Sequence, residues 1–136
     1  SLVDGINKNL IDVIVSDHKP EDEESKRLTF SQAATGASGI ETFLSLALEQ
    51  FHNGSIKLEK IIELITHNPA KILKIDKGNL SVGVNADFCI VDISKPWIVK
   101  KENLVSKSKN TSIEGRKLQG KVLSTFVKGQ ELYKIK

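Results

Sequence analysis

The sequence predicts an α/β fold in which one buried strand is followed by helices and then by a small β region. Three observations support this prediction. Residues 10–16 form a mostly apolar, β-branched run, as in a strand buried on both faces. Apolar residues then recur at helical spacing between positions 43 and 73. Short β-type runs separated by turn residues follow from position 86.

The first predicted strand ends in Asp17-His18, and Pro20 stops its continuation. A strand that carries a carboxylate at its C-terminal tip and is followed by helices is how a (β/α) barrel places a catalytic acid or base. Asp17 is therefore a candidate catalytic residue. The alternative is an Asp that caps the following loop, which is common at such positions.

Three helices are predicted in the middle of the chain. Ser38 and Glu41 have the spacing of a capping box, which predicts a helix from about residue 39 to the glycine at position 54. Leucine and isoleucines at i, i+3, i+4 and i+7 predict a second helix over residues 58–65. Asn68-Pro69 fits the cap and first position of a third, short helix.

The last part of the chain is predicted to be β structure. Lys128-Gly129 has the composition of a tight turn between its last two strands. Residues 100–119 are polar and lack periodicity, which predicts a long loop. The expected strands cover residues 86–91, 97–99, 121–127 and 131–133.

The composition excludes several classes of protein. The 136 residues, 27% charged and 39% hydrophobic, fit one soluble globular domain, and no apolar run approaches the roughly 18–20 residues of a membrane span. A net charge of +3 spread along the chain, with one Trp and one Tyr, does not indicate a nucleic-acid surface. The first residues show no secretory signal, and the single Cys89 fits a reducing, cytoplasmic compartment. Its apolar neighbours predict a buried, inert thiol.

The first strand also bears on domain organisation. A strand that is apolar on both faces needs parallel neighbours, and parallel strands need crossover connections that this chain does not contain. The simplest explanation is that these residues form the C-terminal part of a longer protein, whose N-terminal part supplies most of a barrel.

Four motifs occur in the order seen in the amidohydrolase superfamily. They are VSDHKP at residues 15–20, GASGIET at 36–42, NPAKIL at 68–73 and GVNADF at 83–88. More narrowly, the chain resembles the C-terminal third of the bacterial dihydroorotase family, whose tail is also similar to residues 107–111 and 120–122.

This resemblance implies a fold and a reaction. Residues 1–77 would form the C-terminal end of a metal-dependent (β/α)₈ barrel, with residues 10–16 as its last strand. Residues 78–136 would form the C-terminal part of a composite β-sandwich. The reaction would be the reversible cyclisation of N-carbamoyl-aspartate to dihydroorotate in pyrimidine biosynthesis. It would use one or two zinc ions whose other ligands lie upstream, so the isolated segment is expected to be inactive.

The resemblance also assigns roles to individual residues. Asp17 matches the carboxylate that ligates the metal and carries the proton from the nucleophile to the leaving nitrogen. His18 is expected to pack or to orient the loop rather than to bind the metal. Backbone groups of Thr35 and Gly36 match the loop that lies against the pyrimidine ring.

Glu21 departs from the family pattern. Many dihydroorotases have a His at this position, where it contacts the substrate carboxylate, whereas a glutamate would repel an anionic substrate. Lys19, or Lys26 and Arg27 further along, could restore a positive charge.

Two alternatives remain open at this point. A non-catalytic homologue would act as a scaffold for aspartate transcarbamoylase, and a related cyclic amidohydrolase would act on allantoin or a hydantoin. The expected partners are a small-molecule substrate and, for the protein itself, a second copy in a homodimer. Neither nucleic acid nor a membrane is expected as a partner.

Overall fold

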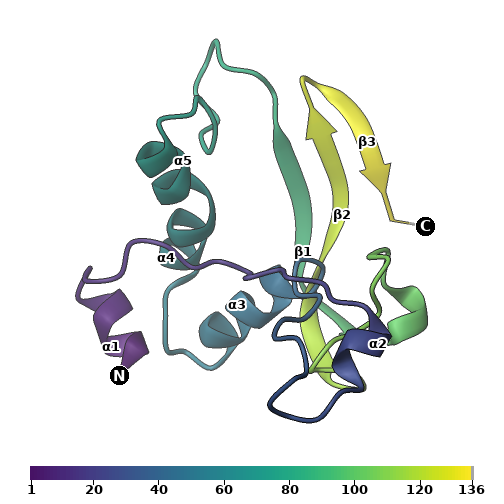
Figure 1. The fold of residues 1–136 in the computed structure, drawn as a ribbon. Coiled ribbons are helices and arrows are strands. Elements are labelled where there is room, and N and C mark those ends of the chain that lie inside the picture. The colour runs from purple at the N-terminus through teal and green to yellow at the C-terminus, as the bar shows by residue number, and fades with distance from the viewer. Residues whose placement is uncertain (136) are drawn as a thin grey trace.

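The computed structural model describes residues 1–135, and most of its helices lie to one side of a three-stranded sheet (Figure 1). None of the helices it describes is long and apolar enough to cross a bilayer. The elements in chain order are the helices α1 (Leu2–Asn7), α2 (Glu23–Lys26), α3 (Phe43–His52) and α4 (Leu58–Ile62), the π-helix η1 (Glu63–His67), α5 (Asn68–Leu73), the strand β1 (Phe88–Ile98), the 3₁₀ turn η2 (Lys101–Asn103), β2 (Lys117–Val127) and β3 (Gln130–Lys134).

The main hydrophobic core lies among α1, α3, α4 and η1. Ile61 and Leu64 are completely buried at its centre. Ile11 and Ile14 of the extended segment 10–16 pack against the same core. The segment that leads to Asp17 is therefore held by helices on one side. The core consists of Ile6, Ala47, Ile56, Ile61 and Leu64.

The strand predicted over residues 10–16 is not formed in the part of the chain that the structure describes. The segment is extended but unpaired, and Leu10 and Val15 remain 74% and 72% exposed. One parallel bridge, between His18 and Ala37, follows it. A parallel strand forms only beside neighbouring strands, and the described residues supply none there.

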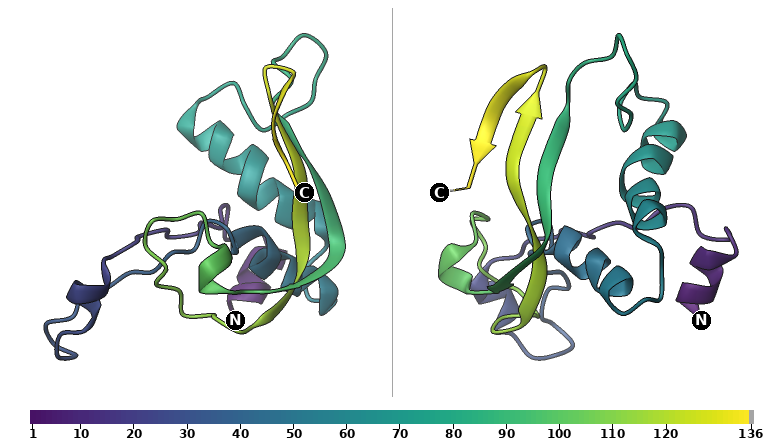
Figure 2. Two further views of the ribbon diagram at one scale, coloured as in Figure 1. Left: turned by 90° about the vertical axis from the view of Figure 1, so that its right-hand side faces the viewer. Right: turned by 180° about the vertical axis from the view of Figure 1, so that it is seen from behind.

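The second and third predicted helices are one continuous rod (Figure 2). The prediction that Asn68 caps a separate helix was wrong: α4 runs into α5 through η1 without a break, and the Asn68 side chain donates to the Asp12 carbonyl instead of capping. Pro69 accounts for the π turn. It lacks an N–H, and its ring would collide with the carbonyl four residues earlier in a regular α-helix, so the preceding turn widens.

The sheet has the order β1-β2-β3, and both pairings are antiparallel. The two strands predicted over 86–91 and 97–99 are a single strand, β1, with irregular register after Ile90 and between Asp92 and Pro96. Part of the predicted loop also belongs to the sheet, because β2 begins at Lys117 and η2 lies within the loop. The turn prediction is confirmed: Lys128 and Gly129 both have positive φ, as a two-residue hairpin turn requires.

Two short helices were not predicted. Ser1 and Asp4 form a capping box that begins α1, a signal visible in the sequence. Asp22 caps α2 by accepting a hydrogen bond from the Ser25 N–H at 2.7 Å. Both helices are shorter than two turns, and such segments carry little periodicity.

Cys89 is exposed, which contradicts the prediction of a buried thiol. Its partner across the sheet is Thr125, whose hydroxyl lies 3.5 Å from the Cys89 sulfur. Among the described residues α3 is the helix that packs on the sheet, against β2. The end of β1 that carries Cys89 stands clear of it (Figure 1), so the apolar neighbours of Cys89 do not cover its side chain.

Trp97 joins the sheet to α3. Its indole N–H lies 3.1 Å from both the Ser45 hydroxyl oxygen and the Gly120 carbonyl oxygen, and the Ser45 hydroxyl donates to the same carbonyl at 2.6 Å. Gly120 has a φ of 99°, which side-chain-bearing residues rarely adopt, and a Cβ there would also lie 2.5 Å from Leu48 Cδ1, so glycine favours this close approach of β2 to α3. The Lys121 ammonium lies 3.6 Å above the Trp97 ring, and burial lowers the pKa of this lysine.

Asp87 anchors the turn between β2 and β3, and it makes the stability of the chain depend on pH. Its carboxylate accepts hydrogen bonds from the Lys77 ammonium and from the Lys128 N–H, which lower its pKa. Because the pKa is lower in the folded chain, the stabilisation is fully present above the unfolded value of about 4 and is lost as pH falls through the folded value.

We therefore expect the wild-type chain to lose stability between about pH 5 and pH 2.5 more steeply than Asp87→Asn. Urea denaturation at a series of pH values measures this difference. Asp76→Asn is the matched control, since Asp76 is exposed and makes no side-chain hydrogen bond in the described residues. Equal pH dependence of the wild type and Asp87→Asn would contradict the prediction.

Candidate functional site

Asp17 lies at the end of the extended segment 10–16, where the chain turns. It has a positive φ of 45°, a conformation that Asp and Asn adopt more readily than other residues with side chains. The residue is exposed, and its carboxylate makes no hydrogen bond within the described residues. The turn thus presents an exposed carboxylate that has no hydrogen-bond partner among the described residues.

His18 points from the same turn toward the next loop. Its Nδ1 accepts hydrogen bonds from the N–H groups of Gly39 and Ile40, at 3.1 and 3.3 Å. A neutral imidazole that accepts at Nδ1 carries its proton on Nε2, so neither ring nitrogen of this tautomer is free to bind a metal. The contact therefore positions the loop.

The glycine-rich loop, residues 33–39, passes close to the residues that follow Asp17. The Lys19 N–H donates to the Ala37 carbonyl at 3.1 Å. Gly36 has a φ of 129°, and a Cβ there would lie 2.4 Å from the Lys19 carbonyl oxygen. Only glycine permits this approach. Thr35, just before it, is exposed. The structure thus brings the Asp17 turn and the Thr35-Gly36 loop side by side.

Glu21 forms a salt bridge with Lys19, with 3.7 Å between its Oε1 and the ammonium. Of the three cations considered from the sequence, Lys19 is thus the one beside Glu21. The Lys26 ammonium instead donates to the Ala34 carbonyl at 2.6 Å. Arg27 pairs with Glu23 at 2.9 Å, on α2.

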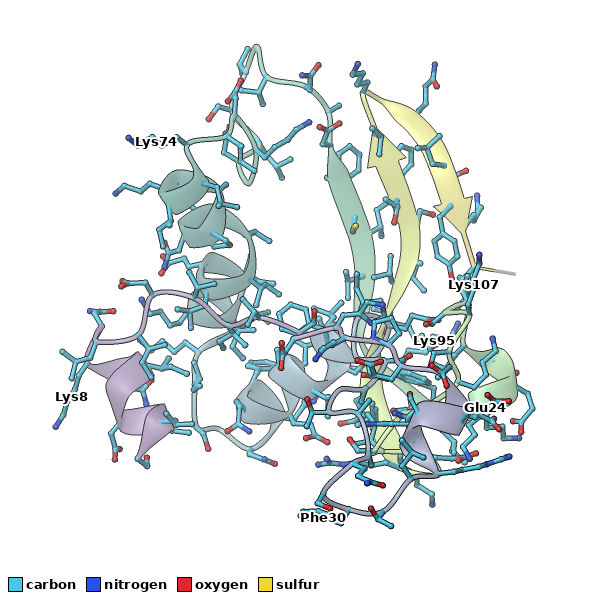
Figure 3. All side chains as sticks on the ribbon, viewed as in Figure 1. Lys8, Glu24, Phe30, Lys74, Lys95 and Lys107 are labelled. Atoms are coloured by element: carbon cyan, nitrogen blue, oxygen red, sulfur yellow. The ribbon has the colours of Figure 1, made fainter. Side chains whose placement is uncertain are left out.

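The segment between Glu21 and Thr35 extends away from the sheet (Figure 2). It contains α2, and the ring of Phe30 is fully exposed at its tip (Figure 3).

A second loop, which sequence reasoning left without a role, holds the glycine-rich loop in place. This tail loop, residues 104–110, lies about 70 positions further along the chain. The Asn110 side-chain amide donates to the Gly36 carbonyl at 3.2 Å, and the Ser38 N–H donates to the Asn110 carbonyl at 2.8 Å. The Ser108 hydroxyl donates to the Glu21 carbonyl at 2.5 Å. The tail loop therefore contacts both candidate substrate-binding segments.

Glu41 also bonds to the tail loop, which corrects its predicted role in a capping box. Its carboxylate accepts from the N–H groups of Val105 and Ser106, at 2.9–3.0 Å. The helix begins at Phe43, after Thr42 as N-cap, and not near Gly39. The predicted capping box is not formed, because the Ser38 hydroxyl donates to the Ser108 carbonyl and the Glu41 carboxylate bonds to the tail loop.

We expect Asn110→Asp to loosen the glycine-rich loop. The substitution keeps the shape of the side chain but replaces the amide donor with a carboxylate that faces the Gly36 carbonyl. The loss of this hydrogen bond, with the repulsion added, should cost about 1–2 kcal/mol of stability. Urea denaturation measures the loss, and Asn103→Asp is the matched control because Asn103 makes no side-chain hydrogen bond in the described residues. Equal stability of both variants would contradict the assignment.

The residues present can supply one metal ligand but not a complete site. A catalytic zinc site typically needs about three protein ligands. Residues 1–135 contain no group of three or more His, Cys, Asp and Glu side chains close enough to hold an ion. Asp17 fits as a single ligand, because its carboxylate is exposed and free of other bonds.

A sequence profile described as the amidohydrolase family matches residues 1–132. The chain belongs to the amidohydrolase family. A dihydroorotase from Wolbachia sp. subsp. Drosophila simulans is 39% identical over 98% of the chain and 30% of its own length. A dihydroorotase from Aquifex aeolicus is 40% identical over 98% of the chain and 32% of its own length.

Among solved structures of amidohydrolases, an L-hydantoinase (dihydropyrimidinase) from Arthrobacter aurescens is similar in fold. Its TM-score is 0.91 at 30% identity, over 98% of the chain and 31% of that protein. The chain therefore spans about 30% of the length of the relatives it matches. The likeness to amidohydrolases extends over the whole set of elements described above.

Proposed function

We propose that this chain is the C-terminal part of a dihydroorotase, which interconverts N-carbamoyl-aspartate and dihydroorotate in pyrimidine biosynthesis in the cytoplasm. The observation that carries the proposal is the free Asp17 carboxylate beside the Gly36 loop. The 39% identity to proteins named dihydroorotase supports this substrate over a hydantoin. The hydantoinase of similar fold is 30% identical.

In this proposal, residues 1–77 complete a (β/α)₈ barrel and residues 78–136 complete a β-sandwich. The extended segment 10–16 would be the last strand of the barrel. Support comes from its exposed apolar side chains, Leu10 and Val15, and from the helices packed on one side of it. The rest of the barrel would bury these side chains, and it would place Asp17 at the C-terminal end of its strand, where such barrels carry their active sites.

Asp17 would move the proton that ring closure and ring opening require. In ring opening its carboxylate accepts a proton from the attacking water and gives it to the leaving nitrogen; in ring closure the nitrogen attacks, and the carboxylate passes the nitrogen's proton to the departing hydroxyl, which leaves as water. When bound, zinc would supply a Lewis acid that activates water and polarises the carbonyl group. Asp17 would be one of its ligands, and the remaining ligands would come from outside this chain.

The Thr35-Gly36 loop would bind the substrate through its backbone. The Lys19 carbonyl fills the place of a Gly36 side chain and Asn110 binds the Gly36 carbonyl, so a planar ring would approach the Gly36 N–H and the Thr35 backbone from the opposite side. The tail loop and His18 hold this loop at two places, through the Gly36 carbonyl and the Gly39 N–H. A loop fixed in this way loses little conformational entropy when it binds a ligand.

The negative charge of Glu21 would weaken the binding of an anionic substrate. The Lys19 ammonium, 3.7 Å from the Glu21 Oε1, would partly offset this repulsion. We therefore expect Glu21→His to lower KM for dihydroorotate about tenfold, because a hydrogen bond to a charged group replaces a repulsion. Steady-state kinetics of the full-length protein measures this change. Glu24→His, on the exposed surface of α2, serves as the control. An unchanged or higher KM in Glu21→His would remove Glu21 from the substrate site.

The proposal is tested on the full-length protein by its zinc content and by turnover of dihydroorotate, allantoin and hydantoin measured side by side. Bound zinc with selective turnover of dihydroorotate is the expected result. Selective turnover of a hydantoin or of allantoin would assign the chain to a related cyclic amidohydrolase instead.

Glu21 also motivates a second candidate, a non-catalytic homologue that serves as a scaffold for aspartate transcarbamoylase. Such a protein would fold without binding zinc and would turn over none of the three substrates. Co-purification with aspartate transcarbamoylase, in a protein that lacks turnover, would favour this candidate.

A further inference from the structure

The π turn in the helical rod bonds directly to the segment that carries Asp17. Two hydrogen bonds join them. The Ile14 N–H donates to the Leu64 carbonyl at 3.1 Å, and the Asn68 side-chain amide donates to the Asp12 carbonyl at 2.9 Å. In an extended chain, backbone groups two residues apart point to the same edge. The rod therefore bonds to one edge of the segment at two consecutive positions.

The Leu64 carbonyl is free for this bond because of the residues that follow it. In a regular α-helix it would accept from the N–H of residue 68, but the Asn68 N–H donates to Glu63 instead. In the π pattern it would accept from the N–H of residue 69, and Pro69 has none. Both possible donors within the helix are thus removed, and the Ile14 N–H takes their place.

We propose that Asn68 and Pro69 are positioning residues that set the register of segment 10–16 and thereby place the Asp17 carboxylate. Pro69 widens the turn and frees the Leu64 carbonyl, and the Asn68 amide holds the adjacent position. The inference rests on the proposed function for its catalytic consequence. Its structural part concerns the described residues alone.

Register matters here because side chains of an extended segment alternate between two faces. A slip of one residue moves the chain by about 3.3 Å and turns every side chain to the opposite face. Asp17 lies three residues beyond Ile14, so its carboxylate follows such a slip directly. The isolated bridge between His18 and Ala37 would break with it. Displacements of about 1 Å at a reacting group already reduce rates up to a hundredfold.

The structural part is tested by amide hydrogen exchange in the full-length protein, with the rate at Ile14 compared to that at the buried Ile61. Asn68→Asp replaces the donating amide with a carboxylate, and Pro69→Ala restores an N–H and allows a regular helix. Both are expected to speed exchange at Ile14 about tenfold while Ile61 stays protected. The control is Asn79→Asp, because the Asn79 side chain only accepts a hydrogen bond, from the Ser81 N–H, and an aspartate keeps it.

The catalytic part is tested on the full-length protein. We expect Asn68→Asp to lower kcat about tenfold to a hundredfold and to change KM for dihydroorotate less than about twofold, since Asp17 moves while the Asn110 amide still holds the Thr35-Gly36 loop through the Gly36 carbonyl. Unchanged exchange at Ile14 in both variants, or the same increase in Asn79→Asp, would overturn the inference. Faster exchange at Ile14 with an unchanged kcat would overturn its catalytic part. A wild-type protein without turnover would overturn the proposed function, and the exchange rates would still decide the register.

Discussion

Asp17→Asn is expected to lower kcat of the full-length protein about a thousandfold or more while the fold remains intact. The amide has the same shape as the carboxylate, but it can neither accept a proton at neutral pH nor ligate a cation as an anion does. The fold should survive because Asn tolerates the positive φ of 45° at this position as well as Asp does. The carboxylate also makes no hydrogen bond in the described residues that the change would break.

The measurement combines kcat for dihydroorotate with zinc content and the urea midpoint of the same preparations. Asp76→Asn is the matched control, since it removes one exposed carboxylate elsewhere on the surface. A kcat of Asp17→Asn within a few-fold of the wild-type value would remove Asp17 from the mechanism. Loss of turnover with a lowered urea midpoint would instead assign Asp17 a role in folding.

Gly36→Ala is expected to destabilise the chain by about 2–4 kcal/mol, a large effect for the addition of one methyl group. Two causes act together. The φ of 129° is one that residues with a side chain rarely adopt, and the new Cβ would lie 2.4 Å from the Lys19 carbonyl oxygen. That oxygen cannot move away easily, because the same peptide segment is bonded to Ala37 and Gly36 is bonded to Asn110.

Urea denaturation of the 136-residue chain measures this destabilisation, and Gly83→Ala separates its two causes. Gly83 also has a positive φ, 95°, but a Cβ there would meet no atom within 4 Å. We expect Gly83→Ala to cost about 1–2 kcal/mol, from the backbone conformation alone. Equal losses in both variants would show that the contact between the Gly36 loop and Lys19 does not constrain the site.

Much of the local structure could be predicted from the sequence because it depends on neighbours a few residues apart. The rod from residue 58 onward follows from isoleucines and leucines at helical spacing, although the predicted start of a separate helix at Asn68-Pro69 was wrong. The turn at Lys128-Gly129 follows from the conformations those residues accept. Composition and spacing failed where a partner distant in sequence decided the outcome. Cys89 is exposed because no described element covers its face of the sheet, and Glu41 bonds to the tail loop and not to its own helix.

In the candidate site, too, some features could be predicted from the sequence and others depend on the tertiary structure. The order of the motifs, from Asp17 through the Gly36 loop to the tail, was visible in the sequence and is what marks the chain as an amidohydrolase. Their contacts were not visible. Asn110 meets Gly36 across 74 positions, and Asn68 meets Asp12 across 56. A sequence by itself determines which conformations each segment prefers, because propensity and periodicity act over a few residues. Only the tertiary structure decides which backbone groups of distant segments meet, because each such hydrogen bond depends on the path of the whole chain between its two partners.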